Sequence, residues 1–340
     1  MIFLGKKLIP HKYISIIAEI SCNHEQSIDK AYLLINAAKD AGADAVKIQA
    51  YIPDEMTINS ASVDFKIKGG PWNGNTLWEL YNKTYTPLQW IPYLFEYAKF
   101  SKIPMFASVF GEQSLAALEA VDCPAYKIAS FELNDTYLIR TVAKIGKPMV
   151  LSTGVATQDE VDRAIDIISV ENSAYPLVMH CISKYPAKIN ELQLNKILAY
   201  QELYKDVGFS DHTLTSTAAQ LAITLGATVI EKHLTLTETS EDSKFSLRPK
   251  EFRRFVNDCH DTIKALEIYK EEPDRQFKRS LYVVKDVKQG EKFTKESIRS
   301  IRPGYGLDPN KLFDTIDQYA SCDLAIGTAL KEEHIVWKTK

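Results

Sequence analysis

The sequence predicts a (β/α)8 barrel followed by a small C-terminal domain. Eight short apolar runs suit strands, amphipathic segments between them suit helices, and polar residues end each run. At 340 residues, the chain is long for one domain but fits a barrel with an appendage. We therefore expect a barrel over residues 1–268, a linker at 269–278 and a second domain at 279–340.

The elements alternate in chain order. Strands are expected at residues 14–20, 45–51, 105–110, 125–130, 148–153, 177–183, 207–211 and 228–234. Helices are expected at residues 27–41, 87–100, 157–169, 213–225 and 249–269, with plausible N-caps at Ser27, Thr86, Thr157 and Thr213. A doubly wound sheet is the rival fold, but no strand-to-helix turn carries a GxGxxG or Walker fingerprint.

Two connections are longer than usual, residues 52–86 after the second strand and residues 235–248 after the eighth. Long loops on the C-terminal face of a barrel commonly act as lids or subunit contacts. Residues 269–280 are polar and contain Pro273, which suits a linker. The segment after them has apolar positions of its own and is small for independent stability.

Composition narrows the functional classes. A net charge of -3 argues against nucleic acid or an anionic membrane as the main partner. The five cysteines form no CxxC pair, which is typical of a reduced cytosolic protein. Neither a signal peptide nor a run of about 20 apolar residues is apparent, so we expect a cytoplasmic protein without membrane spans.

Polar side chains gather where the expected strands end. Alternate residues of a strand share a face, so the pairs on one strand can point together into the barrel mouth. These pairs are Lys47 with Gln49, Ser210 with His212, and Glu231 with His233. Because active sites of such barrels lie at this end, the pattern predicts a ligand site.

The two histidines end neighbouring strands. His212 lies in GFSDHT and His233 in EKHLTL. Two imidazoles from adjacent strands can bind one divalent transition metal, with water completing its shell. Their spacing is not that of HExxH, so buried, hydrogen-bonded histidines without metal remain the alternative.

Lys47 and Lys127 lie within otherwise apolar strands, where an unpaired ammonium is costly to bury. They either pair with Glu19, Glu132 or Glu231, or they bind an anionic ligand. Two cations with nearby serine hydroxyls suit a ligand that carries both phosphate and carboxylate, such as phosphoenolpyruvate.

Three acidic residues, Glu19, Glu132 and Asp242, are candidates for proton transfer or for binding sugar hydroxyls. The alternative is that each is an ordinary solvated carboxylate. Phe245, close to Asp242, could pack against an apolar part of a ligand.

Longer motifs carry a family resemblance. The segment IAEISCNHEQSIDKAYLLINAAKDAGADAVKIQAY resembles the opening of the sialic acid synthase family. YKIASFE, LSTGVAT, HCISKYPA, GFSDHT and GATVIEKHLTL follow in that family's order and spacing. The tail RSLYVVKDVKQGEKFTKESIRSIRPGYGL resembles its SAF domain, which is similar to type III antifreeze protein. The resemblance covers nearly the whole chain.

Two loops resemble one branch of that family. GGPWNGNTLWELY and SEDSKFSL are most similar to the enzymes that make pseudaminic acid from 2,4-diacetamido-2,4,6-trideoxy-L-altrose. Ser183 stands where the N-acetylneuraminic branch usually has asparagine. The resemblance implies condensation of the sugar with phosphoenolpyruvate and release of phosphate by C–O bond cleavage.

The resemblance also implies residue roles. His212 and His233 would hold a divalent metal, most simply Mn2+, with Mg2+ or Co2+ as alternatives. Glu132 would transfer a proton. Residues that would hold phosphoenolpyruvate or face the sugar are Lys47, Lys127, Ser130, Ser152, Ser210, Glu19, Gln49, Tyr185 and Asp242. Arg302 in IRPGYG would reach the sugar of a partner subunit, which implies a domain-swapped homodimer.

Alternatives stay open at this point. A related synthase could use a manno-configured sugar to make N-acetylneuraminate or legionaminate. An aldolase could add pyruvate through a Schiff base on Lys127 or Lys232. The antifreeze-like tail leaves a non-catalytic sugar- or ice-binding protein as a third class.

Overall fold

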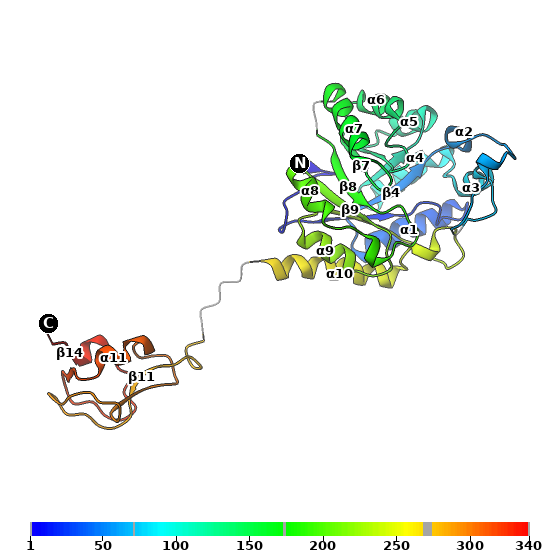
Figure 1. The fold of residues 1–340 in the computed structure, drawn as a ribbon. Helices are drawn as coiled ribbons and strands as arrows, with labels where there is room; N and C mark the ends of the chain where they lie inside the picture. The colour runs from blue at the N-terminus through cyan, green and yellow to red at the C-terminus, as the bar shows by residue number, and fades with distance from the viewer. Residues whose placement is uncertain (1, 71, 173–174, 268–273, 339–340) are drawn as a thin grey trace. The chain divides into compact units, whose positions relative to one another are not determined.

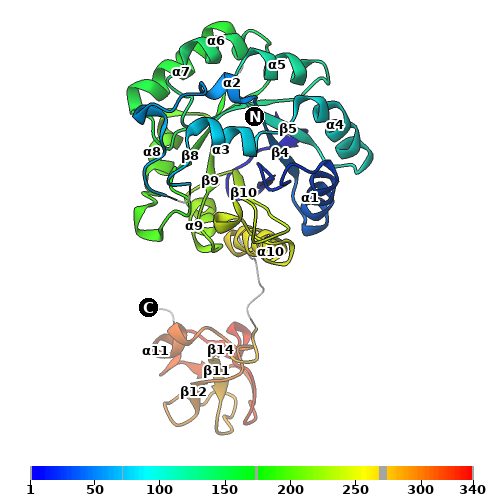
Figure 2. The ribbon, with the colours of Figure 1, turned by 90° about the vertical axis from the view of Figure 1, so that its right-hand side faces the viewer.

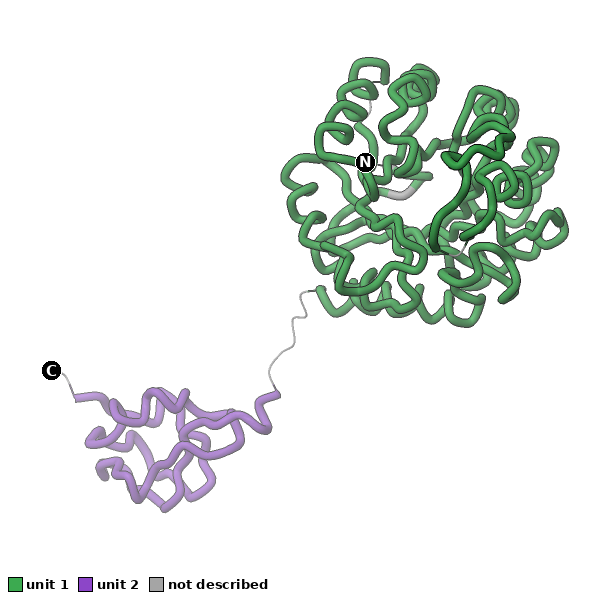
Figure 3. Tube along the Cα trace, turned by 45° about the vertical axis from the view of Figure 1, so that its right-hand side comes forward, with its two compact units in different colours: residues 1–267 green, residues 268–340 purple. Residues whose placement is uncertain are grey.

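The structure is a computed structural model that describes residues 2–70, 72–172, 175–267 and 274–338. It divides into two compact units, residues 1–267 and residues 268–340 (Figures 1 and 3). Residues 269–273 of the expected linker lie outside the described residues.

Eight parallel strands of the first unit close into a barrel in the order β10-β3-β4-β5-β6-β7-β8-β9. The strands are β3 (Ser15–Glu19), β4 (Ala45–Ala50), β5 (Met105–Val109), β6 (Tyr126–Ile128), β7 (Met149–Ser152), β8 (Leu177–Cys181), β9 (Val207–Asp211) and β10 (Val229–His233). The predicted barrel is confirmed, and each strand lies inside the range expected from the sequence.

Helices surround the strands, as Figure 2 shows. They are α1 (Ile28–Ala41), α2 (Pro53–Met56), α3 (Leu77–Thr84), α4 (Ile91–Phe100), α5 (Glu112–Glu119), α6 (Thr136–Ala143), α7 (Gln158–Glu171), α8 (Lys196–Leu203), α9 (Thr217–Thr224) and α10 (Pro249–Leu266). Except for α2 and α3, their apolar faces pack against the strands and form one continuous core with them.

Two of the four expected N-caps are confirmed and two are wrong. Ser27 and Thr157 accept hydrogen bonds from the first turns of α1 and α7. Thr86 does not cap α4, because a short 3-10 turn (Leu88–Trp90) precedes that helix. Thr213 does not cap α9, which begins after Ser216, because its amide and hydroxyl bond within the preceding turn.

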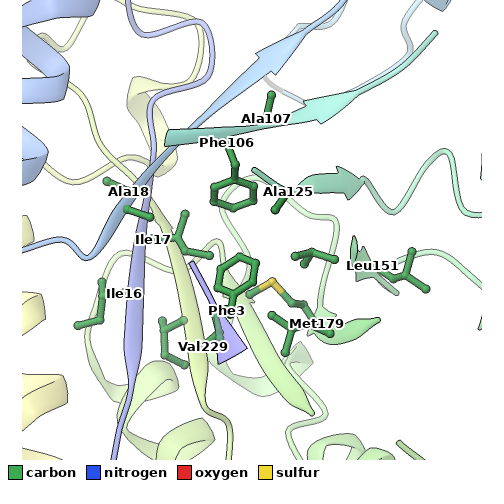
Figure 4. Packing of buried hydrophobic residues seen from close by; sticks show 14 of the residues in the cluster. Phe3, Ile16, Ile17, Ala18, Phe106, Ala107, Ala125, Leu151, Met179 and Val229 are labelled. Carbon is green, nitrogen blue, oxygen red and sulfur yellow. The ribbon is translucent and has the colours of Figure 1, made fainter. Parts of the chain in front are cut away.

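An N-terminal hairpin, which the sequence pattern did not predict, closes the end of the barrel opposite the C-terminal ends of the strands. Strands β1 (Ile2–Phe3) and β2 (Lys6–Lys7) pair antiparallel. The ring of Phe3 is fully buried and lies among Ile17, Phe106 and Val229 (Figure 4). It meets the Phe106 ring edge-on, with centroids 5.5 Å apart. The floor of the barrel is therefore packed with apolar side chains.

The two long connections expected from the sequence are the loops that follow β4 and β10. The first contains α2, a 3-10 turn (Val63–Phe65) and α3. The second contains a 3-10 turn (Ser243–Phe245) just before α10. Both follow C-terminal strand ends, so they lie on the face where barrel active sites form.

The second unit has its own small core. It contains β11 (Ser280–Val283), β12 (Ile298–Ile301), α11 (Leu312–Thr315), β13 (Tyr319–Ala320), β14 (Ile335–Val336) and 3-10 turns at Pro309–Lys311 and Glu332–His334. Leu281, Phe293 and Leu330 are fully buried in its centre. Arg302, just after β12, is exposed.

None of the helices in the described part of the chain is both long and apolar enough to cross a membrane. The five cysteines are free thiols, and Cys322 is the exposed one among them.

Candidate active site

A polar cavity opens at the C-terminal ends of the barrel strands. Nine residues predicted from the sequence line it together: Lys47, Gln49, Lys127, Ser130, Ser152, Tyr185, Ser210, His212 and His233. Ser108, Phe131, Cys181 and Glu231 line it as well. They converge because they lie either at mouth-facing positions of neighbouring parallel strands or in the segments that follow the C-terminal ends of those strands.

The two lysines form an ion-pair network with two glutamates. Lys127 Nζ lies 2.6 Å from Glu231 Oε1, and Lys47 Nζ lies 3.7 Å from the same oxygen. Lys47 also pairs with Glu19 and donates to Ser108 Oγ at 2.8 Å. Of the sequence alternatives, pairing with Glu19 and Glu231 is what the structure contains.

This network shifts the pKa of its carboxyls in opposite directions. Burial alone would raise the pKa of Glu231, but the ammonium groups of Lys127 and Lys47 outweigh burial and lower it. Glu19 is fully buried, and that burial raises its pKa above the ordinary value despite Lys47. Glu231 is therefore the anion that holds both lysines, and Glu19 is the acid more readily protonated.

The two histidines lie side by side, with ring centroids 5.5 Å apart. Burial lowers the pKa of His212 to about 4 and that of His233 well below its ordinary value. His212 Nδ1 lies 2.9 Å from the carbonyl of Ile182, which leaves Nε2 as a free acceptor. Both rings are neutral at pH 7, as metal ligation requires.

A hydroxyl cluster lies beside them at the ends of β6 and β8. Ser130 Oγ and Ser183 Oγ are 2.6 Å apart, and Ser152 Oγ is buried with no partner among the described residues. A Cβ at Gly154 would come within 2.1 Å of Ser183 Oγ, so only glycine fits there. Ser152 therefore offers a free hydroxyl, and Ser130 and Ser183, which bond each other, complete a cluster that can hydrogen-bond an anion.

The predicted acids do not line this cavity. Asp242 contacts Ser21 Oγ and lies 3.7 Å from His233 Nδ1, and burial raises its pKa to about 6. Burial also raises the pKa of Glu132 to about 7, and its Oε2 has no hydrogen-bond partner among the described residues. Arg302 belongs to the second unit.

Aromatic rings cover the histidine side of the cavity. Phe245 is 1% exposed, and its ring centroid is 4.9 Å from that of His233 and 4.8 Å from that of Tyr185. Phe245 thus packs against the rings of both histidines. Trp72, on the long connection after β4, packs against Tyr185, with ring centroids 5.9 Å apart.

The sequence analysis assigned no role to Trp72. It placed Glu231 at the barrel mouth with His233 and named it as a possible partner of the lysines, and the structure contains both arrangements. Trp72 lies in GGPWNGNTLWELY, but motif spacing does not reveal where a long loop folds. Its buried Nε1 has no partner among the described residues.

Comparison with known proteins agrees with this geometry. The chain is 42% identical to a pseudaminic acid synthase of Campylobacter jejuni over 94% of this chain and 96% of that protein. It is 39% identical to a pseudaminic acid synthase of Helicobacter pylori, over 94% and 97%. It is 30% identical to an N,N'-diacetyllegionaminic acid synthase of Legionella pneumophila, over 94% of each.

Two solved structures share both the fold and part of the sequence of this chain. The spore coat polysaccharide biosynthesis protein SpsE of Bacillus subtilis matches with TM-score 0.66, 29% identity and 99% coverage of both chains. An N-acetylneuraminic acid synthetase of Leptospira borgpetersenii, in complex with citrate, matches with TM-score 0.71 and 27% identity over 80% of this chain and 92% of that one.

Family models match both units. The SAF domain model matches residues 278–336, within the second unit. The NeuB family model matches residues 34–271, which is more than half of the chain. With the cavity of lysines, serines and paired histidines at the barrel mouth, these matches show that the chain belongs to the NeuB family.

Proposed function

We propose that this chain is a pseudaminic acid synthase, which condenses phosphoenolpyruvate with 2,4-diacetamido-2,4,6-trideoxy-L-altrose and releases phosphate. The observation that carries the proposal is the 39–42% identity to pseudaminic acid synthases of two species along nearly the whole chain. The identity to a diacetyllegionaminic acid synthase is lower, at 30% over a similar length. The manno-configured alternative is therefore the less favoured one.

Phosphoenolpyruvate suits the cation and hydroxyl side of the cavity. Lys47 and Lys127 supply two positive charges, and Ser130 after β6, Ser152 on β7 and Ser210 on β9 supply neutral donors. Glu231 holds both ammonium groups in place before the ligand binds. An entering phosphate or carboxylate would compete with Glu231 for them.

A divalent metal suits the histidine side. His212 Nε2 is free to accept a metal, and His233 Nδ1 is buried without a hydrogen-bond partner among the described residues. Within those residues, no group of three or more His, Cys, Asp and Glu is arranged around a metal site. The ligands would therefore be two imidazoles, with water or substrate oxygens completing the shell. A bound metal would polarise the sugar aldehyde as a Lewis acid.

The remaining side chains suit the sugar and the proton transfers. Tyr185 and Gln49, which line the cavity, would bind its polar groups together with Asp242, which lies 3.7 Å from His233 Nδ1. Glu19 pairs with Lys47. After C3 of phosphoenolpyruvate bonds to the aldehyde carbon, water adds at C2 and phosphate leaves with C–O cleavage. Glu132 would accept the proton of that water, because its pKa of about 7 suits exchange near neutral pH.

The sugar assignment predicts a clear order of substrates. The diacetamido-trideoxy-altrose should give the highest kcat/KM, with N-acetylmannosamine poor or inactive. A site built for a second acetamido group leaves its polar partners unpaired when that group is missing. Phosphate release with phosphoenolpyruvate across mono- and diacetamido sugars measures this order. If a manno-configured sugar wins, the branch is wrong while the family stands; if only pyruvate reacts and borohydride traps it, the enzyme is an aldolase.

We further propose a homodimer in which Arg302 of one subunit completes the site of the other. Support comes from the exposure of Arg302 within a separate C-terminal unit. Mixing Arg302→Ala chains with Lys127→Ala chains should restore part of the activity, because some heterodimers contain one intact site. Arg279→Ala chains serve as the matched control for the first partner, since Arg279 bonds to Ser300 within its own unit. Heterodimers that form and stay inactive would contradict the shared site.

A further inference from the structure

A separate buried ion pair lies directly behind the histidines, outside the cavity. Lys232 Nζ lies 2.8 Å from Asp211 Oδ2, and both side chains are 0% exposed. The two residues are register partners in the β9–β10 ladder. Neither lines the cavity, and the condensation as proposed uses neither of them.

Strand alternation places this pair back to back with the histidines. His212 follows Asp211 and His233 follows Lys232, so side chains one residue apart point to opposite faces. His212 and His233 face the cavity, whereas Lys232 faces α10, with its ammonium 5.3 Å from the centre of the Phe255 ring. The pair therefore joins the outer faces of the two strands whose inner faces carry the imidazoles.

The pair also fixes the backbone after His212. Thr213 N donates to Asp211 Oδ1 at 2.8 Å, and Lys232 Nζ donates to the carbonyl of Thr213. Lys232, which precedes His233, is thus bonded to the side chain before His212 and to the backbone carbonyl after it. A shift of either strand end would break at least one of these charge-assisted bonds.

We propose that Asp211 and Lys232 are positioning residues that fix the separation of the two imidazoles for one divalent metal. This inference rests on the metal site of the proposed function. A site with only two protein ligands has little redundancy, so its affinity depends on holding both rings at the right spacing. Groups that orient ligands from behind typically change metal affinity ten- to a hundredfold when they are removed.

The alternative is that the pair only stabilises the fold. Apolar residues of similar volume often replace a buried ion pair without loss of stability, whereas removal of one partner leaves a costly buried charge. The informative variant therefore removes both charges together. Asp211→Asn with Lys232→Met keeps the volume and removes the charge-assisted bonds.

Titration of the full-length protein with Mn2+, followed by the EPR signal of free Mn2+, measures the affinity. The double variant should bind Mn2+ about tenfold or more weakly, while its thermal midpoint stays within a few degrees of the wild type. Asp211→Glu keeps the ion pair and should retain the affinity within about threefold. Should the double variant not fold, Asp211→Leu with Lys232→Met, which replaces both charged residues by apolar ones, carries the test, with the same loss expected.

A matched control removes another ion pair of the barrel. Glu119→Gln with Lys147→Met deletes a pair 2.8 Å apart on the part-exposed outer surface and should leave the affinity unchanged. A folded double variant with wild-type affinity would overturn the positioning role. Wild-type protein that binds no Mn2+ would instead remove the metal assignment, and this proposal with it.

Discussion

Exhaustive chelation of the wild-type enzyme should abolish phosphate release from phosphoenolpyruvate, and added Mn2+ should restore it. His212→Ala and His233→Ala should lose about a thousandfold or more in kcat, with no rescue by added Mn2+, because Lewis-acid polarisation contributes several kcal/mol. Two neutral imidazoles with centroids 5.5 Å apart are the basis of this expectation.

The control for the histidine variants is His260→Ala. His260 lies on α10 and does not line the cavity, so its loss should leave both activity and metal response unchanged. Steady-state phosphate release with and without chelator measures all three variants. Full activity of chelated wild-type enzyme, or Mn2+ rescue of a histidine variant, would exclude the two-histidine metal site.

Activity should depend on pH through Glu132. Burial raises the pKa of its carboxyl to about 7, so the carboxylate that accepts the water proton is scarce below that pH. As pH rises from 5 to 7, kcat/KM should rise by about tenfold per unit, and it should level off above 7. Glu132→Gln should lose about 10²- to 10⁴-fold in kcat and should lose this ascending limb.

The matched control is Glu112→Gln, an exposed acid at the start of α5. It should keep both the rate and the pH profile of the wild type. A Glu132→Gln variant that retains the ascending limb near pH 7 would assign that limb to another group. Asp242, whose pKa burial raises to about 6, would then be the next residue to vary.

The sequence predicted the barrel and the strand residues of the site because strand periodicity is local. Lys47 with Gln49, and Ser210 with His212, face one cavity because residues two apart on a strand share a face. Once the barrel was assigned, parallel register brought these pairs together without further information.

The remaining features depend on contacts between distant segments. Spacing in the sequence could not show that Trp72 would contact Tyr185, or that Phe3 would fill the barrel floor. Nor could it decide between a glutamate and a ligand as partner of the lysines, because Glu231 lies 104 residues from Lys127. Such pairings are set by tertiary packing, and loops in particular fold according to what they cover.

The apolar side chains packed around Phe3 close one end of the barrel, so ligands reach the cavity from the C-terminal ends of the strands. Whatever is held against the strand ends must enter before the molecule that lies above it, and it must leave afterwards. In the proposed assignment the deeper position belongs to phosphoenolpyruvate, on Lys127 and Ser152 of the strands, and the outer one to the sugar, near Asp242 of a loop. The proposed function therefore implies an ordered reaction, in which phosphoenolpyruvate binds before the sugar and phosphate is released last.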